Sequence, residues 1–268
     1  MNFSYLCREN QQYMDAGIHY LLITAAGVGG STLFGYLLGY FIKDVPHKVN
    51  DTILGLCAGI MMAAAIMGLI VPAVSSYDTF PGKLIPIAGV FVGALFLTFI
   101  DRFTPHLHKL AGLDNEQHAN DKHLDRILLF VLAIAIHKFP EGMSAGVGFA
   151  NGGAPSLIGS AISVAIGISI QNIPEGMVIV SPLLLAGVSR RRTLVIALAI
   201  SALEVLGVFT GYLLGSISEF FLPFMLAFSG GAMLYVVSDE MIPESHAHGY
   251  QKPATFALIA GFIFMLLI

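Results

Sequence analysis

The sequence contains few charged residues, and this shortage is its first informative property. Only 11% of its 268 residues are charged and 56% are hydrophobic, whereas a soluble domain has about a quarter charged residues. The mean hydropathy is +0.80. A net charge of −4 and the lack of a continuous basic patch argue against a nucleic-acid partner. Composition therefore predicts an integral membrane protein that lies almost entirely within the lipid bilayer.

Cysteine is scarce too. Cys7 lies in a polar tail and Cys57 in a hydrophobic segment, so we expect no disulfide between them. There is no CxxC pair, and the sequence gives no support for metal binding by thiolates.

Residues 1–17 carry no hydrophobic core. They lack the basic start, apolar middle and small-residue cleavage site of a signal peptide. We therefore expect an extracytoplasmic polar tail, followed by a first span that is retained.

Long apolar segments recur over residues 18–268, which we interpret as a single transmembrane domain. We predict an all-α polytopic fold with eight transmembrane helices, near 18–42, 51–74, 83–101, 125–150, 156–181, 191–216, 221–243 and 253–268.

The basic residues test this topology. With both termini outside, the outer side has only Arg8 and Lys83, and Lys138 lies within a span. The inner loops hold Lys43, Lys48, Arg102, Lys109, Lys122, Arg126, Arg190, Arg191, Arg192 and Lys252. This strong positive-inside bias supports eight helices in a bacterial-type inner or plasma membrane.

The 102–124 segment is the longest connection and is predicted to be cytoplasmic. It contains His106, His108, His118 and His123 among several acidic residues. Composition leaves two interpretations open, a solvated loop or a low-affinity tract that collects or senses metal.

A short internal repeat is also visible. Gly59–Pro72 and Gly230–Pro243 each frame a stretch rich in small residues and methionine, in helices predicted to run in opposite directions. Inverted repeats of this kind are common in secondary transporters, with the substrate site at their interface.

Two stretches carry the functional signal, HKFPEG at 137–142 and QNIPEG at 171–176. His137 precedes Glu141, and Gln171 precedes Glu175, by four residues, so each pair shares one helix face. Glu204 lies about the middle of the 191–216 helix. Ionisable groups at bilayer depth are costly and usually mark an ion path. We predict a divalent-metal site formed by these five side chains, against the alternative of a purely structural polar cluster.

Prolines and glycines within the two motifs are expected to let their helices bring the ligand side chains together. Pro140 and Pro174 lack an N–H and are expected to kink their helices. Gly142 and Gly176 permit close helix approach at the same level.

The ligand types restrict the metal and its role. Imidazole, amide and carboxylate donors suit Zn, Mn or Fe(II), with Cd as a mimic, and disfavour Cu(I). The metal is then a transported substrate and not a cofactor, and no covalent chemistry is needed. Two alternatives are an intramembrane metal-dependent hydrolase, which the absence of HExxH disfavours, and a non-transporting metal sensor, for which a signalling domain is lacking.

A second polar group is predicted at the inner membrane face. Asp239 and Glu240 are expected to line an exit path, and Asp101 closes the 83–101 helix on the same side. Glu244, His246 and His248 are interpreted as interfacial caps, and Met61, Met62 and Met67 as packing residues.

The paired PEG motifs resemble the ZIP (Zrt/Irt-like) family of divalent-metal transporters, and within it the GufA-like group. Further similar segments are Ala58-Gly-Ile-Met-Met, Asp101-Arg…Pro105-His-Leu-His108 and Ala232-Met-Leu-Tyr…Glu240-Met-Ile-Pro-Glu244. The resemblance covers essentially the whole chain. It implies a 3+2+3 arrangement with inverted symmetry, metal uptake into the cytosol, a homodimer, and no ATP site. It also implies that the helices at 18–42, 125–150, 156–181 and 191–216 move as a unit against the rest.

The same resemblance places transport ligands at His137, Glu141, Gln171, Glu175 and Glu204, and inner release residues at Asp101, Asp239 and Glu240. Two positions depart from the family pattern. Lys138 stands where the family often has an asparagine that binds a second metal, and Asn172 where some relatives have a carboxylate. We predict that the Lys138 ammonium lies among Glu141, Glu175 and Glu204 and replaces that second metal, because it has donors but no lone pair to offer. The alternative is that Lys138 points toward water. Ser75 also replaces an acidic residue of some relatives, so cation collection at the outer side is expected to be weaker.

Overall fold

The computed structural model describes residues 3–41, 46–110, 137–150, 155–185, 188–218 and 220–268. All regular structure within these ranges is helical, which is expected because a backbone in lipid must satisfy its hydrogen bonds internally. The elements are α1 (Phe3–Phe41), α2 (His47–Ala63), the π-helical η1 (Ala64–Ile70), α3 (Val71–Ser75), α4 (Phe80–Leu110), α6 (Pro155–Leu185), α7 (Arg190–Gly215), α8 (Leu222–Val236), the π-helical η4 (Val237–Met241), α9 (Ile242–Ser245) and α10 (Gln251–Leu266). Residues 137–147 form a further helix, the 137–147 helix.

Six of the described helical stretches are long and apolar enough to cross a membrane, and α10 is a shorter apolar helix. These agree with the predicted spans at 18–42, 51–74, 83–101, 156–181, 191–216 and 221–243. The predicted 125–150 span is described only from residue 137 onward. The loop predicted at 102–124 begins too early, because α4 continues as a helix to Leu110, and residues 111–124 lie outside the described residues. The protein is therefore an all-helical polytopic membrane protein.

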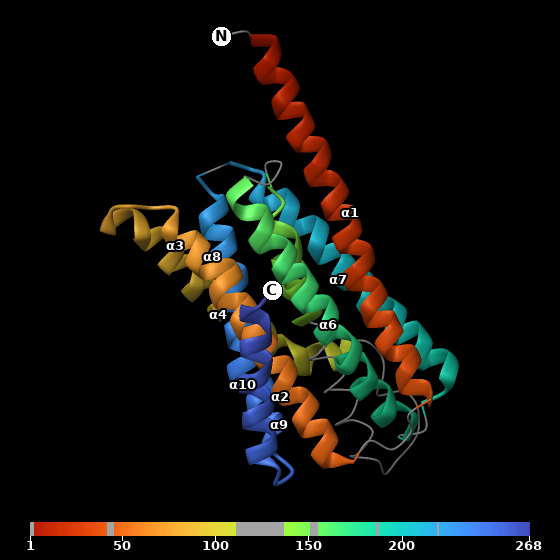
Figure 1. Ribbon diagram of the computed structural model, residues 1–268. Helices are drawn as coiled ribbons and strands as arrows, with labels where there is room; N and C mark the ends of the chain where they lie inside the picture. The colour runs from red at the N-terminus through yellow and green to blue at the C-terminus, as the bar shows by residue number, and fades with distance from the viewer. Residues whose placement is uncertain (1–2, 42–45, 111–136, 151–154, 186–187, 219) are drawn as a thin grey trace.

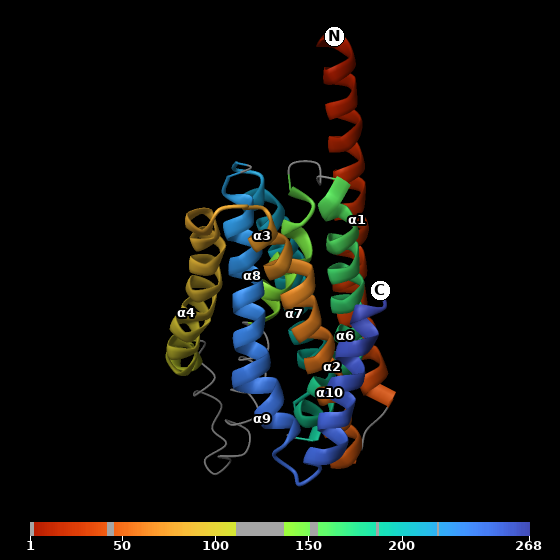
Figure 2. The same ribbon diagram turned by 60° about the vertical axis from the view of Figure 1, so that its left-hand side comes forward.

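The first helix is longer than its predicted span. α1 has 39 residues, which corresponds to about 58 Å at 1.5 Å per residue, against a hydrocarbon core of about 30 Å. Figures 1 and 2 show its N-terminal part rising well beyond the other helices. The polar tail predicted at residues 1–17 is thus mostly a helical extension of the first span.

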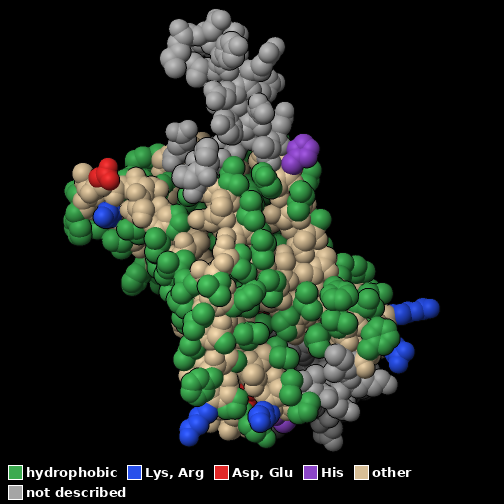
Figure 3. Space-filling view, viewed as in Figure 1, with side chains coloured by type: hydrophobic (Ala, Val, Ile, Leu, Met, Phe, Trp, Pro, Cys, Tyr) green, Lys and Arg blue, Asp and Glu red, His purple; other side chains and the backbone are tan. Residues whose placement is uncertain are grey.

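The helices alternate in direction across the bundle. Figure 2 shows α4 at one edge beside α8, with α2 next and then α6 and α1. The helix ends that flank the α1–α2 and α6–α7 connections, and the α9–α10 connection, lie toward the lower end in Figure 1. On the face in Figure 3 the side of the molecule is hydrophobic or uncharged, and the Lys and Arg side chains lie mainly at the lower end. Exposed basic residues at these connections include Lys48, Arg190 and Lys252.

Close backbone contacts divide the helices into two groups. The first group, which we name the α1 group, consists of α1, the 137–147 helix, α6 and α7. Its helices approach one another through glycines, such as Gly142 against Glu204 and Gly176 against Thr32. The second group, the α2 group, consists of α2–α3, α4, α8–α9 and α10. Its helices also approach one another through glycines, such as Gly59 against Leu258. A Cβ on any of these glycines would meet backbone atoms of the neighbouring helix.

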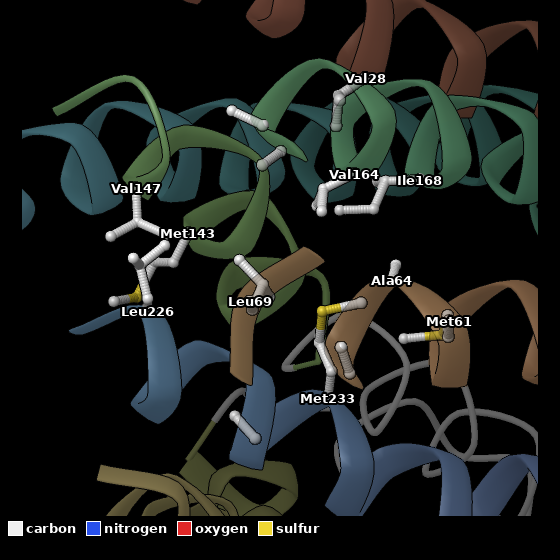
Figure 4. Packing of buried hydrophobic residues seen from close by; sticks show 14 of the residues in the cluster. Val28, Met61, Ala64, Leu69, Met143, Val147, Val164, Ile168, Leu226 and Met233 are labelled. Atoms are coloured by element: carbon white, nitrogen blue, oxygen red, sulfur yellow. The ribbon is translucent and has the colours of Figure 1, made fainter. Parts of the chain in front are cut away.

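Side chains fill most of the interface between the two groups. Figure 4 shows Val164 and Ile168 of α6 packed across from Met61 of α2 and Met233 of α8. Met61 is buried as predicted, but Met67 is 48% exposed, so its prediction as a packing residue is wrong. The core therefore lies between the groups and joins them by side-chain packing.

The two segments of the internal repeat share a π-helical turn. η1 ends at Ile70, two residues before Pro72, and η4 ends at Met241, two residues before Pro243. The N–H of the residue before each proline bonds the carbonyl five residues earlier. Proline has no N–H to continue an α-helical ladder, and a π-turn widens the helix just before it. The repeat seen in sequence thus has a counterpart in backbone geometry.

Candidate metal centre

The Lys138 side chain is the centre of a buried polar cluster. Its Nζ lies 2.6 Å from Glu141 Oε2, 2.7 Å from Glu175 Oε2 and 3.7 Å from Glu204 Oε1. It also donates to Asn172 Oδ1 at 2.5 Å. Lys138 is only 1% exposed, so its charge is compensated by these groups and not by water. The ammonium thus lies among the three predicted carboxylates and does not point toward water.

Glu141 and Gln171 bind each other across two helices. Gln171 Nε2 donates to Glu141 Oε1, while the other oxygen of Glu141 faces Lys138. Both side chains are buried, at 4% and 0% exposure. The amide oxygen of Gln171 is buried as well, and it has no hydrogen-bond partner among the described residues. Such an orphaned acceptor is costly in a membrane interior and is suited to a cation.

Glu204 is the most firmly held carboxylate of the cluster. Thr32 Oγ1 donates to its Oε2 at 2.5 Å, and Asn172 Nδ2 donates to its Oε1 at 2.7 Å. Asn172 also reaches the Val28 carbonyl of α1 at 3.3 Å. Glu204 is fully buried. These bonds fix one carboxylate of α7 to both α1 and α6.

Glu175 is the cluster's most accessible carboxylate. Its side chain is 16% exposed, against 0% for Glu204 and 4% for Glu141. Its Oε2 accepts a hydrogen bond from the Lys138 ammonium.

His137 lies apart from the Lys138 contacts. Its Nδ1 is 2.9 Å from Glu240 Oε2 of η4, and the ring is 6% exposed. Sequence reasoning placed His137 in the central site and Glu240 on the inner exit path. The structure brings these two residues together across the interface between the α1 group and the α2 group.

The other inner residues are more open. Asp239 is exposed in η4, and the Glu240 side chain is 30% exposed. Asp101 lies in α4, but its side chain falls outside the described residues. Among the described residues, no three His, Cys, Asp or Glu side chains are arranged so that they could hold a metal ion. The carboxylates are gathered around an ammonium in this conformation.

Helix packing places these side chains at one level. α6 runs without a break through Pro174, and the 137–147 helix runs through Pro140. Gly142 lets its helix approach the Glu204 carbonyl of α7 so closely that a Cβ would lie 2.9 Å from the Glu204 carbonyl carbon. The ligand residues of three helices therefore meet because small residues stand beside them.

Sequence reasoning missed several polar residues. Thr32 carried no motif, yet it bonds Glu204. Asp51 is fully buried near the start of α2, and its Oδ1 lies 2.9 Å from His248 Nδ1. His248, predicted as an interfacial cap, also stacks on His47, with ring centroids 4.4 Å apart. The only signal for Asp51 was a carboxylate at the edge of an apolar segment.

Comparisons of the sequence with known proteins identify a family and several relatives. The sequence model of the family described as ZIP Zinc transporter matches residues 111–268. The chain is 38% identical over 252 residues to Zinc transporter GufA of Myxococcus xanthus, covering 92% of this chain and 96% of that protein. It is 33% identical to Zinc transporter ZIPB of Bordetella bronchiseptica, covering 93% and 80%. Zinc transporter ZIP11 of Homo sapiens is 29% identical over 88% of this chain.

These relatives are named as transporters, and the hydrolase alternative has no support among them. A match of this extent to the family and to full-length relatives shows the family. The chain is a membrane transporter for divalent metal and not an enzyme, and it belongs to the ZIP family of zinc transporters.

Proposed function

We propose that the chain takes up divalent metal into the cytosol through the Lys138 cluster, with zinc as the main substrate and Mn, Fe(II) and Cd as further ones. The observation that carries this proposal is the gathering of three carboxylates, from three helices, inside an apolar bundle. An apolar core would stabilise the bundle as well as these buried charges do, so stability alone does not explain the carboxylates. The relatives named above as zinc transporters support zinc as the substrate.

The charge of the cluster fits a single ion. Counting three carboxylates and one ammonium, the cluster carries two negative charges. One divalent cation cancels that charge, whereas a second would leave an excess of positive charge in a low-dielectric interior. Lys138 thus takes the place of a second metal, and each chain holds one ion at a time.

Metal binding requires a limited exchange of partners. Gln171 offers its orphaned amide oxygen, and Glu141 and Glu175 turn oxygens from the ammonium toward the ion. His137 adds an imidazole by turning away from Glu240. The resulting N/O ligand set is of the type that zinc, manganese and iron accept.

The inner path begins at His137. Its contact with Glu240 joins the central residues to an acidic group at the inner end of α8–α9, where Asp239 is exposed. Release toward the cytosol then proceeds from His137 to Glu240 and Asp239, with Asp101 of α4 as a further member.

The membrane arrangement belongs to the same proposal. Eight helices form a 3+2+3 inverted repeat, both termini lie outside, and the 102–124 loop is cytoplasmic. The basic residues at the lower end in Figure 3 support this orientation. We assign the chain to an inner or plasma membrane and expect a homodimer.

The test is uptake into proteoliposomes of Zn, Mn, Fe(II) and Cd, for the wild type and Glu175→Ala. We expect saturable uptake in the wild type and a loss of at least about tenfold in Glu175→Ala, because removing a metal-binding group costs at least that in affinity. The control is Ser163→Ala on the same helix, whose hydroxyl bonds only backbone carbonyls among the described contacts. Tight binding without uptake would contradict transport, and uptake unchanged in Glu175→Ala would contradict this site.

A further inference from the structure

Asp51 is a buried carboxylate that lies outside the Lys138 cluster. It is near the start of α2 and is fully buried. Its Oδ1 lies 2.9 Å from Nδ1 of His248, and its Oδ2 is buried without a hydrogen-bond partner among the described residues. A buried carboxylate with so few partners is costly unless a positive charge faces it. The pair is therefore more stable when the imidazole of His248 carries an additional proton.

His248 connects this buried carboxylate to the solvent. Its side chain is 32% exposed, and its ring stacks on that of His47, the first residue of α2, with centroids 4.4 Å apart. In the proposed orientation this end of the molecule faces the cytosol, so cytosolic protons can reach the pair. Within the part of the chain that the structure describes, no three His, Cys, Asp or Glu side chains are grouped to hold a metal ion. The cation that this pair takes up is therefore a proton.

The pair joins two segments of the inner face. His248 lies in the turn between α9 and α10, next to Gly249, whose φ of 88° is a conformation that favours glycine. On one side of this turn α10 packs along α2, and on the other side α9 follows directly from η4, which carries Asp239 and Glu240. The contact between Asp51 and His248 thus helps to hold the turn that follows two of the proposed release residues.

The other titratable groups around the pair have contacts of their own or are open to solvent. The His246 ring contacts α9 and α10, and Glu175 of α6 and Glu240 of η4 lie in the ion pairs described above. The remaining groups on the elements that pack against α2 are at least partly exposed, namely His47, Lys48, Tyr235, Asp239, Glu244, Tyr250 and Lys252. The buried charge of Asp51 therefore depends chiefly on His248.

We propose that the Asp51–His248 pair is a proton-operated clasp, which holds the α9–α10 turn on α2 when it is protonated and loosens when the proton leaves. Histidine is the side chain that changes charge between about pH 5 and 8. The stabilisation that the clasp supplies is thus present at the acid end of this range and is lost as the cytosolic pH rises. Its link to transport rests on the proposed function. A loosened turn no longer fixes η4 and α9, so uptake slows at high internal pH.

The clasp is tested on the full-length protein by hydrogen exchange of the 245–250 backbone amides, measured by mass spectrometry at about pH 5.5 and about pH 8. After correction for intrinsic exchange rates, we expect exchange at the higher pH to be at least about tenfold faster, because a hydrogen bond to a charged group contributes that factor. His248→Gln and Asp51→Asn should each remove this pH dependence. His246→Gln is the matched control in the same turn, and His47→Gln tests the stacked ring; both should keep it.

The outcomes separate the clasp from the proposed function. Equal exchange at both pH values in the wild type, or a pH dependence that survives in His248→Gln and Asp51→Asn, overturns the clasp. Uptake into proteoliposomes with the same two internal pH values tests the link to transport: the wild type should slow at the higher pH, and equal uptake at both would overturn the link. Absence of uptake under every condition overturns the proposed function and leaves the exchange result standing. Size-exclusion profiles identify a variant that fails to fold, and the other variant of the pair then carries the test.

Discussion

At the scale of single residues, Lys138 determines how much space the central cluster leaves for an ion. It bonds two carboxylates and one amide oxygen within 2.7 Å, so its ammonium occupies space that an ion would otherwise fill. A lysine has donors but no lone pair for a metal. In the proposed function Lys138 therefore leaves room for one ion.

Replacing Lys138 with asparagine is expected to raise the number of metal ions bound per chain. The variant removes a fixed positive charge and adds an amide oxygen, which makes room for a second cation. Metal content per chain after equilibrium dialysis measures this. Lys138→Arg, which keeps the charge, serves as the control and should leave the stoichiometry unchanged; equal stoichiometry in all three proteins would show that Lys138 does not replace a metal.

Thr32 is expected to stabilise the protein through Glu204. In Thr32→Val the buried Glu204 Oε2 loses the donor that now lies at 2.5 Å. Leaving a buried acceptor unsatisfied costs about 1–3 kcal/mol, so the free energy of unfolding should fall by that amount. Thermal unfolding in detergent measures it, with Thr32→Ser as the matched variant that retains the hydroxyl; equal losses in both variants would assign the effect to packing.

At the scale of helices, glycine sets the distances that assemble the cluster. Gly142 faces the Glu204 backbone of α7, and Gly207 of α7 faces the Phe139 carbonyl of the 137–147 helix. The two helices thus approach each other through glycines on both sides. The carboxylates of Glu141 and Glu204 depend on this approach for their common partner, Lys138.

Gly142→Ala is expected to abolish uptake, although it changes no polar group. Its Cβ would lie 2.9 Å from the Glu204 carbonyl carbon and 3.1 Å from the Val208 nitrogen, so the helices must separate. Gly159→Ala on α6 is the control, because a Cβ there meets nothing within 4 Å. Proteoliposome uptake compares them, and normal uptake by Gly142→Ala would mean that this helix spacing is not needed.

The helices themselves were predictable because long apolar segments have few alternatives in a bilayer. The spacing of His137 and Glu141, and of Gln171 and Glu175, also predicted shared helix faces and a common site. In the structure Glu141 and Glu175 both contact Lys138, whereas His137 contacts Glu240. The role of Thr32 and the position of Cys57 could not be predicted, because each depends on a residue of another helix more than a hundred positions away. The π-turns before Pro72 and Pro243 also escaped prediction, since a proline in a helix is compatible with either a kink or a widened turn.

The whole molecule consists of two groups of helices that meet mostly through side chains. The α1 group carries the donors of the central cluster, and the α2 group surrounds it on the other side. Backbones interlock within each group, whereas Val164 and Ile168 pack on Met61 and Met233 between them (Figure 4). Such an interface is compatible with sliding, which fits alternating access by motion of the α1 group against the rest.

A disulfide across this interface is expected to arrest transport. A Cβ on Gly68 of η1 would lie 3.7 Å from the Cβ of Val164 of α6, within the usual disulfide range of about 3.5–4.5 Å. In the double variant Gly68→Cys with Val164→Cys, oxidation should stop uptake and a reductant should restore it. The single variants control for the substitutions, and uptake that persists in fully cross-linked protein would rule out motion at this interface.

The ammonium within the cluster also has a consequence for biosynthesis. Many metal sites take shape only when the metal arrives, because their ligands repel one another until then. Here the Lys138 ammonium is itself a cation that three acidic side chains face. A newly made chain can therefore complete its fold in a cell that is starved of its cargo, which is when a transporter of this kind is needed.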